Sequence, residues 1–162
     1  MKLLFLFLFV INTLHADRLL LSIASKHNND KDMYGEEFNE VNLGIGYEFD
    51  IIDDEDYLLM LDVLALKDSY SNPMYSVTVG VDHKATSWFR FGFDFGIASR
   101  KTKYVYFNKP VYFEREVIPI IFIPTATINY KKLSLSVLHI PQMDYKGKRV
   151  EGVTLTILGY SF

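Results

Sequence analysis

His27 and the adjacent pair Asp68 and Ser69 are the side chains whose types could support nucleophilic chemistry. A histidine can act as a general base near neutral pH, and a serine becomes a nucleophile when such a base lies beside it. In a usual Ser-His-Asp set the acid stands behind the imidazole, which does not suit an aspartate that directly precedes the serine. The three residues therefore form a candidate catalytic set in which the individual roles stay open.

Each of these residues also has an ordinary interpretation. Asp68 and Ser69 lie in the stretch ALKDSYSNP, and Asp, Ser, Asn and Pro are the residues that commonly build turns. His27 could be a solvated loop histidine. The positions of the three side chains in the fold decide between these interpretations and the catalytic one.

Other chemical motifs are not supported by the sequence. The Gly-x-Gly at residues 44–46 has no helix after it, so it is no phosphate-binding loop. The acidic residues 50–56 lack the central glycine and the spacing of a calcium loop. No zinc-ligand spacing occurs. We therefore expect neither a metal nor a cofactor.

Alternation of apolar and polar residues predicts β-strands along most of the chain. In residues 88–98, five apolar side chains from Phe89 to Ile97 alternate with Arg90, Gly92, Asp94 and Gly96. The apolar face continues from strand to strand, while the opposite face is small and polar. This pattern is typical of a transmembrane barrel with lipid outside. We predict an all-β fold, an eight-stranded antiparallel transmembrane β-barrel with strands over 18–24, 38–49, 57–66, 74–83, 88–98, 117–130, 133–140 and 150–162.

The connections between these strands bring the candidate residues to one rim. Adjacent strands reverse direction, so every second connection opens at the same end, and long loops face outside in bacterial barrels. The longer predicted connections cover residues 25–37, 67–73, 99–116 and 141–149. His27 therefore shares the outer rim with Asp68 and Ser69, whereas His83 and His139 are interpreted as ordinary rim residues. A buried ion-pair network is expected to fill the narrow interior, made of Glu48, Asp62, Asp82, Arg90 and Asp94.

The first sixteen residues are predicted to be a secretory signal peptide. A basic start is followed by an apolar stretch over residues 3–14 and by Leu14-His15-Ala16, which offers a small residue for cleavage. The predicted domains are thus a signal peptide, 1–16, and a barrel, 17–162. The net charge of −3 and the absence of cysteine exclude a basic nucleic-acid-binding module and a disulfide-stapled one.

Two prolines interrupt the predicted strand 117–130. Pro119 and Pro124 each remove a ladder hydrogen bond, so they favour an edge or a break in pairing, and Pro141 follows the neighbouring strand. A barrel that lacks pairing at this place has a gap in its wall.

These residues resemble the lipid A palmitoyltransferase (PagP) family, outer-membrane enzymes that move a palmitoyl chain from a phospholipid to lipid A. The resemblance rests on Ser25-Lys26-His27, Phe38-Asn39-Glu40, Leu66-Lys67-Asp68-Ser69-Tyr70, Ile118-Pro119, Ile123-Pro124, His139-Ile140-Pro141 and the terminal Phe162. It implies that His27, Asp68 and Ser69 are catalytic and that Gly80 forms the floor of an acyl-chain cavity. It also implies that Pro119, Pro124 and Pro141 flank openings through which lipid enters sideways.

The resemblance leads us to expect a monomeric outer-membrane acyltransferase. Its donor would be a glycerophospholipid, its acceptor an hydroxyl of lipid A, and its chain length palmitoyl or similar. The first alternative is a non-catalytic outer-membrane barrel that binds lipid or has a structural or adhesive role. The second is a soluble periplasmic lipid-binding barrel.

Overall fold

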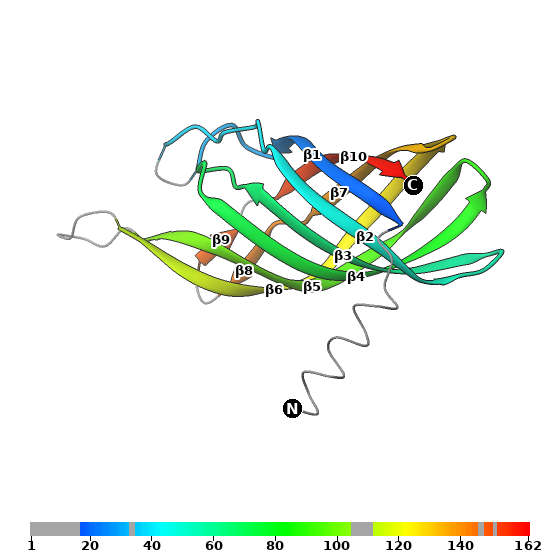
Figure 1. The fold of residues 1–162 in the computed structure, drawn as a ribbon. Coiled ribbons are helices and arrows are strands. Elements are labelled where there is room, and N and C mark those ends of the chain that lie inside the picture. The colour runs from blue at the N-terminus through cyan, green and yellow to red at the C-terminus, as the bar shows by residue number, and fades with distance from the viewer. Residues whose placement is uncertain (1–16, 33–34, 105–111, 146–147, 151) are drawn as a thin grey trace, which may run out of the picture.

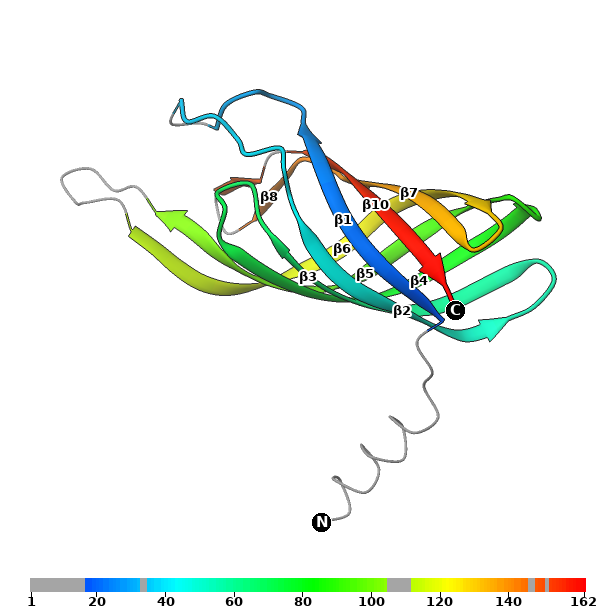
Figure 2. The same cartoon turned by 45° about the horizontal axis from the view of Figure 1, so that its top comes forward.

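The chain forms a closed antiparallel β-barrel of eight strands in a computed structural model that describes residues 17–32, 35–104, 112–145, 148–150 and 152–162 (Figure 1). The predicted signal peptide lies outside these residues. The barrel strands follow the order β1-β10-β7-β6-β5-β4-β3-β2, and β1 lies beside β10 to close the wall (Figure 2). Their bounds are β1 Arg18–His27, β2 Gly44–Asp53, β3 Tyr57–Lys67, β4 Pro73–Thr86, β5 Phe89–Tyr104, β6 Tyr112–Tyr130, β7 Leu133–Ile140 and β10 Val153–Ser161.

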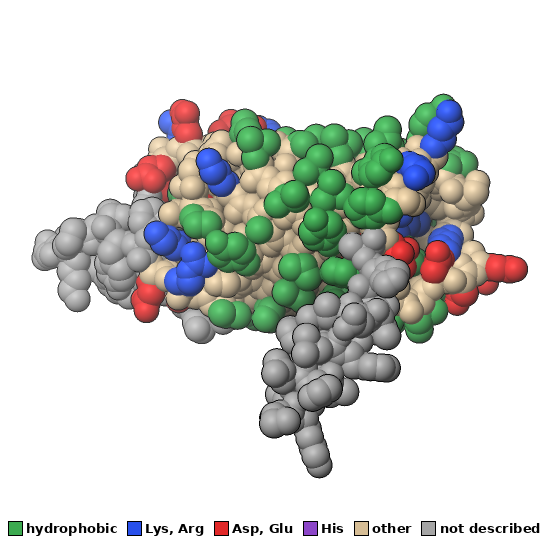
Figure 3. Space-filling view, viewed as in Figure 1, with side chains coloured by type: hydrophobic (Ala, Val, Ile, Leu, Met, Phe, Trp, Pro, Cys, Tyr) green, Lys and Arg blue, Asp and Glu red, His purple; other side chains and the backbone are tan. Residues whose placement is uncertain are grey.

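The outer surface of the barrel is apolar, as the alternation predicted. Phe91, Phe93, Phe95 and Ile97 of β5 are 45% to 53% exposed, whereas Asp94 between them is 2% exposed. Apolar side chains form a belt around the middle on the face seen in Figure 3, and charged side chains gather at both ends. This distribution is that of a barrel with lipid outside and polar groups inside. No helix among the described residues is long and apolar enough to cross a membrane.

The two ends of the barrel differ. Short connections follow β2, β4 and β6 at one end, here called the turn end, where β1 begins and β10 ends. Long connections follow β1, β5 and β7 at the opposite end, here called the loop end. Two predicted loops are partly strand: β5 and β6 continue as a paired hairpin up to Tyr104 and Tyr112, and β8 Met143–Tyr145 pairs with β9 Lys148–Val150.

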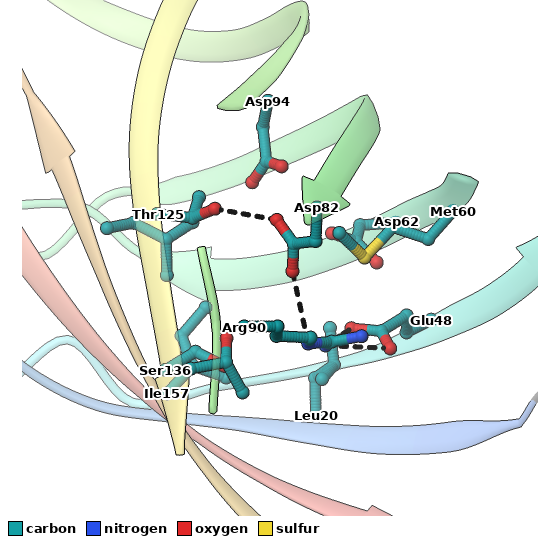
Figure 4. Close-up of a pocket in the computed structure, with 12 residues that line it drawn as sticks. Leu20, Glu48, Met60, Asp62, Asp82, Arg90, Asp94, Thr125, Ser136 and Ile157 are labelled. Atoms are coloured by element: carbon teal, nitrogen blue, oxygen red, sulfur yellow. Dashed lines mark hydrogen bonds and ion pairs between the residues drawn. The ribbon is translucent and has the colours of Figure 1, made fainter. Parts of the chain in front are cut away.

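The barrel interior contains an apolar cluster and, on its turn-end side, a polar layer. The polar layer contains the five residues of the predicted network, but only Glu48, Asp82 and Arg90 form ion pairs there; no ion pair between described residues includes Asp62 or Asp94. Arg90 pairs with Glu48 at 3.0 Å and with Asp82 at 3.1 Å (Figure 4). The apolar cluster lies nearer the loop end and consists of Leu20, Leu64, Leu66, Leu155 and Ile157. From the apolar cluster towards the turn end, the interior therefore changes from apolar to charged.

The wall has the predicted gap between β6 and β7. Their ladder runs from Tyr130 and Leu133 only as far as Thr125 and Leu138, one residue after Pro124. Between Tyr112 and Pro124, β6 pairs with β5 alone among the described strands. Proline is tolerated on such an edge because no neighbour there requires its missing N–H.

Candidate active site

His27 and Ser69 meet at the loop end of the barrel. Ser69 Oγ lies 2.7 Å from His27 Nε2, a distance at which the imidazole can accept the hydroxyl proton. His27 is 6% exposed and Ser69 is half-buried. His27 is the last residue of β1 rather than part of a loop, and Ser69 lies in the connection between β3 and β4.

A β-bulge in β1 directs His27 into the barrel. The pairing of β1 with β10 shifts between Ser22 and Ala24, so Ile23 is an extra residue that is itself exposed. Ser22 faces the interior before the bulge, and Ser25 and His27 face it afterwards. An inserted residue exchanges the two faces of a strand. Without the bulge, His27 would project towards lipid.

Asp68 organises the turn that presents Ser69. Its Oδ1 accepts hydrogen bonds from the backbone N–H groups of Tyr70 at 2.9 Å and Asn72 at 2.8 Å. The Asp68 N–H donates to the Asn72 carbonyl, and Ser71 has a positive φ of 61°. The turn interpretation of this stretch is thus correct, and Asp68 points this oxygen into its own turn.

The electrostatic environment of Asp68 is mixed. Burial raises the pKa of its carboxyl, whereas the hydrogen bonds from Asn72 and Tyr70 oppose that rise. The positive charges of Arg100 and Lys101 oppose it as well. Asp68 is 5% exposed, and its Oδ2 has no hydrogen-bond partner among the described residues. A cationic side chain of β5 therefore lies within electrostatic reach of the turn that carries Ser69.

Two aromatic rings connect His27 with the loop that carries Ser69. Phe38 stacks on the His27 imidazole, with ring centroids 4.0 Å apart and planes 12° from parallel. Tyr70 meets Phe38 edge-on, and its hydroxyl donates to Asp32 Oδ2 at 3.1 Å. Burial and the Asp32 carboxylate raise the pKa of the Tyr70 hydroxyl, so it stays protonated and can donate. The motifs that carry the family resemblance include Phe38 and Tyr70, but the sequence alone predicts no role for either ring.

At the loop end, residues 38–43 take the place of strand pairing between β1 and β2. This segment was predicted as strand, but the β1–β2 pairing stops at Ser22 and Gly44. Asn42, 2% exposed, accepts the Ser22 hydroxyl on its carbonyl at 2.6 Å and donates from Nδ2 to the Lys67 carbonyl at 2.8 Å. The Asn39 N–H donates to the Ser69 carbonyl. Side-chain bonds thus satisfy backbone groups that strand pairing leaves open.

The remaining predicted site residues lie away from the His27–Ser69 contact. Gly80 faces the interior of β4, where Met60 Cε and Asp94 Oδ1 lie 2.7 Å and 2.5 Å from the position of a Cβ. A cavity of about 30 Å³ lies beside it, lined by the polar layer and by Met60, Leu20, Leu138 and Ile157. Pro119 and Pro124 lie on the open edge of β6, and Pro141 follows β7. The described residues contain no group of three potential ligands that could hold a metal ion.

Fold and site together define a small transmembrane β-barrel with a buried His-Ser pair at its loop end. The family model described as "Antimicrobial peptide resistance and lipid A acylation protein PagP" matches residues 11–152. The chain belongs to this family, as the resemblance indicated, and its substrates are therefore membrane lipids. A comparison with curated proteins gave no match.

Solved structures of Ail, an outer membrane protein of Yersinia pestis, share the fold. Ail in a phospholipid bilayer nanodisc aligns with a TM-score of 0.54 at 11% identity, over 91% of this chain and all of that one. The crystal structure of Ail with the heparin analogue sucrose octasulfate aligns with a TM-score of 0.54 at 12% identity, over 90% and 94% of the two chains. At such low identity, the likeness concerns the barrel alone.

Proposed function

We propose that the protein is an outer-membrane acyltransferase that moves a palmitoyl chain, or one of similar length, from a glycerophospholipid to an hydroxyl of lipid A. The observation that carries the proposal is the 2.7 Å contact between Ser69 and His27 at the mouth of a lipid-facing barrel. The family match supports lipid A acylation. The family and the outer-membrane origin of the similar barrels support the location.

The geometry supports a serine nucleophile with a histidine base. Ser69 Oγ attacks the donor ester carbonyl while His27 Nε2 takes its proton. The ester C–O bond breaks, and His27 returns the proton to the departing lysophospholipid oxygen. The lipid A hydroxyl then attacks the Ser69 ester, with its proton passing through His27 back to Ser69. Asp68 stabilises the loop that carries Ser69 through its hydrogen bonds to Tyr70 and Asn72, and Phe38 fixes the orientation of the His27 ring by stacking on it.

The interior supports an acyl chain that descends from Ser69 towards Gly80. The apolar cluster lies along this path, and the polar layer closes its lower end. The present cavity of about 30 Å³ has room for only about two water molecules. A long chain therefore has to displace side chains along this path, such as the flexible Met74 that packs against the apolar cluster. The gap at Pro119, Pro124 and Pro141 is the proposed side entrance for lipid.

Mass spectrometry of lipid A tests the proposal in cells. Expression of the chain should add the mass of one acyl chain to lipid A, and Ser69→Ala and His27→Asn should abolish this addition. His139→Asn is the matched control, because His139 lies on β7 and contacts Thr154 rather than Ser69. Unmodified lipid A with the wild-type chain in the outer membrane would instead favour the non-catalytic barrel. Wild-type chain in the soluble fraction would favour the periplasmic one.

A further inference from the structure

Arg100 projects into the mouth of the barrel from β5. The inward positions of this strand alternate from Arg90 and Asp94 through Ala98 to Arg100, and Ala98 is 2% exposed. The pairing of β5 with β6 keeps one register from Gly96 to Tyr104, so Arg100 stays on the interior face. It is half-buried there. A guanidinium therefore stands at the loop end, above the apolar interior.

This guanidinium has no anionic partner within the described chain. The Arg100 Nε is buried and makes no hydrogen bond there, and none of the seven ion pairs found between described residues includes Arg100. Glu116 stands opposite it on β6, but none of these seven ion pairs joins Glu116 to Arg100. Partly buried cations normally pair, because desolvation of a charge is costly. An unpaired inward arginine thus indicates an anionic ligand.

Arg100 lies close to the residues that present Ser69. Its charge opposes the rise in the pKa of both Asp68 and Tyr70, the two neighbours of Ser69 in the chain. In a glycerophospholipid, only the glycerol carbons separate the ester carbonyl from the phosphate. A lipid with its carbonyl at Ser69 can thus place its phosphate a few bonds away. A guanidinium matches the geometry of phosphate oxygens.

The geometry points to Arg100 as a phosphate-binding residue for a lipid substrate of the proposed reaction. This inference rests on the proposed function, because it assumes that the reacting ester lies at Ser69. The phosphate belongs either to the glycerophospholipid donor or to the lipid A acceptor. In both cases Arg100 binds substrate and takes no part in proton transfer.

Substrates with and without phosphate test this assignment. The donor preference is the rate of transfer to lipid A from phosphatidylcholine relative to that from diacylglycerol of the same chains. The acceptor preference is the rate of transfer from phosphatidylcholine to lipid A relative to that to dephosphorylated lipid A. For Arg100→Gln we expect the preference for one phosphorylated partner to fall at least tenfold. A reduced donor preference assigns the donor phosphate, and a reduced acceptor preference assigns that of lipid A. Equal losses with all three combinations would overturn the proposal and leave Arg100 as a positioning residue for Asp68.

Arg115→Gln is the matched control. Arg115 is an exposed arginine on β6 that donates to the Ser99 hydroxyl at 3.2 Å and lies over the Tyr75 ring, so both preferences should stay unchanged. Arg100→Lys keeps the charge without the planar fork and should show an intermediate loss. Different gel mobility of unheated and heated samples shows that each variant is folded.

A binding measurement separates this proposal from the transfer reaction. Short-chain phosphatidylcholine, or diacylglycerol of the same chains, is titrated into isotope-labelled protein in uncharged detergent, and binding is followed by the NMR chemical shifts of the protein. Arg100→Gln should weaken the binding of phosphatidylcholine at least tenfold, and short-chain diacylglycerol should bind equally to both proteins. If the wild-type protein transfers no acyl chain, the proposed reaction fails. The phosphate site remains supported if the binding of phosphatidylcholine depends on Arg100. It is refuted if neither the binding of phosphatidylcholine nor the binding of lipid A depends on Arg100.

Discussion

The position of Gly80 and Met60 predicts which acyl chain the barrel accepts. Gly80 comes seven residues after Pro73, the first residue of β4. At about 3.4 Å per residue and a tilt of about 40°, it lies about 18 Å below the loop end. Because C–C bonds of about 1.5 Å zigzag, an extended chain advances about 1.27 Å per bond, so a sixteen-carbon chain is about 19 Å long. The depth therefore fits a palmitoyl chain that ends at Gly80 and Met60.

Two opposite substitutions at this floor should move the chain length in opposite directions. Gly80→Ala adds a methyl group where Met60 and Asp94 already crowd the space, which raises the floor by about one C–C bond of about 1.5 Å. Met60→Ala removes three heavy atoms and should admit about two more carbons. The loss of this buried side chain, 3% exposed, should also cost about 2–5 kcal/mol of stability.

Competition between donors measures this effect. Phosphatidylcholines with chains of twelve to eighteen carbons are supplied together, and the acyl chains added to lipid A are identified by mass spectrometry. The wild-type protein should favour sixteen carbons, Gly80→Ala a shorter chain and Met60→Ala a longer one. An unchanged distribution of acyl-chain lengths in both folded variants would refute a cavity floor at Gly80 and Met60.

Three further predictions concern the loop end. Tyr70→Phe removes the hydrogen bond to Asp32 and should slow acyl transfer about threefold to tenfold without altering the barrel's gel mobility, whereas an unchanged rate would mean that this bond does not position Ser69. Deletion of Ile23 removes the bulge and turns His27 outward, so a folded barrel without activity is expected, and an active one would contradict the role of the bulge. Burial raises the pKa of Asp68 in the folded state, so its ionisation costs stability as pH rises above the unfolded carboxyl pKa of about 3.9. The gain in urea midpoint from Asp68→Asn should therefore be larger at pH 8 than at pH 3.5, and a gain that is the same at both would argue against it.

The barrel could be predicted from sequence because its pattern is local. Apolar residues at every second position of β5 report directly which face meets lipid, and Pro119 and Pro124 mark the place where pairing fails. The hydrophobic pattern also fixes register wherever one face must be apolar. The strands, the inward charges and the gap all follow from such short-range information.

The site could be predicted only in part because its geometry depends on tertiary contacts. The segment Leu19 to Ile23 is almost continuously apolar, so alternation there cannot reveal the bulge that turns His27 inward. Residues 41–43 continue the alternation that runs to Phe49, yet Asn42 bonds to neighbouring segments, and residues 38–43 lie outside the ladder. The stacking of Phe38 on His27 joins residues that no periodicity connects.

Transfer of a labelled acyl chain by the purified protein tests the central claim most directly. Phosphatidylcholine carrying a deuterated palmitoyl chain at one position is incubated with lipid A and with the wild-type or Ser69→Ala protein. We predict that the wild-type protein gives deuterated lipid A and an equal amount of lysophospholipid, and that the variant gives neither. Unlabelled lipid A with the folded wild-type protein, or equal labelling by Ser69→Ala, would contradict it.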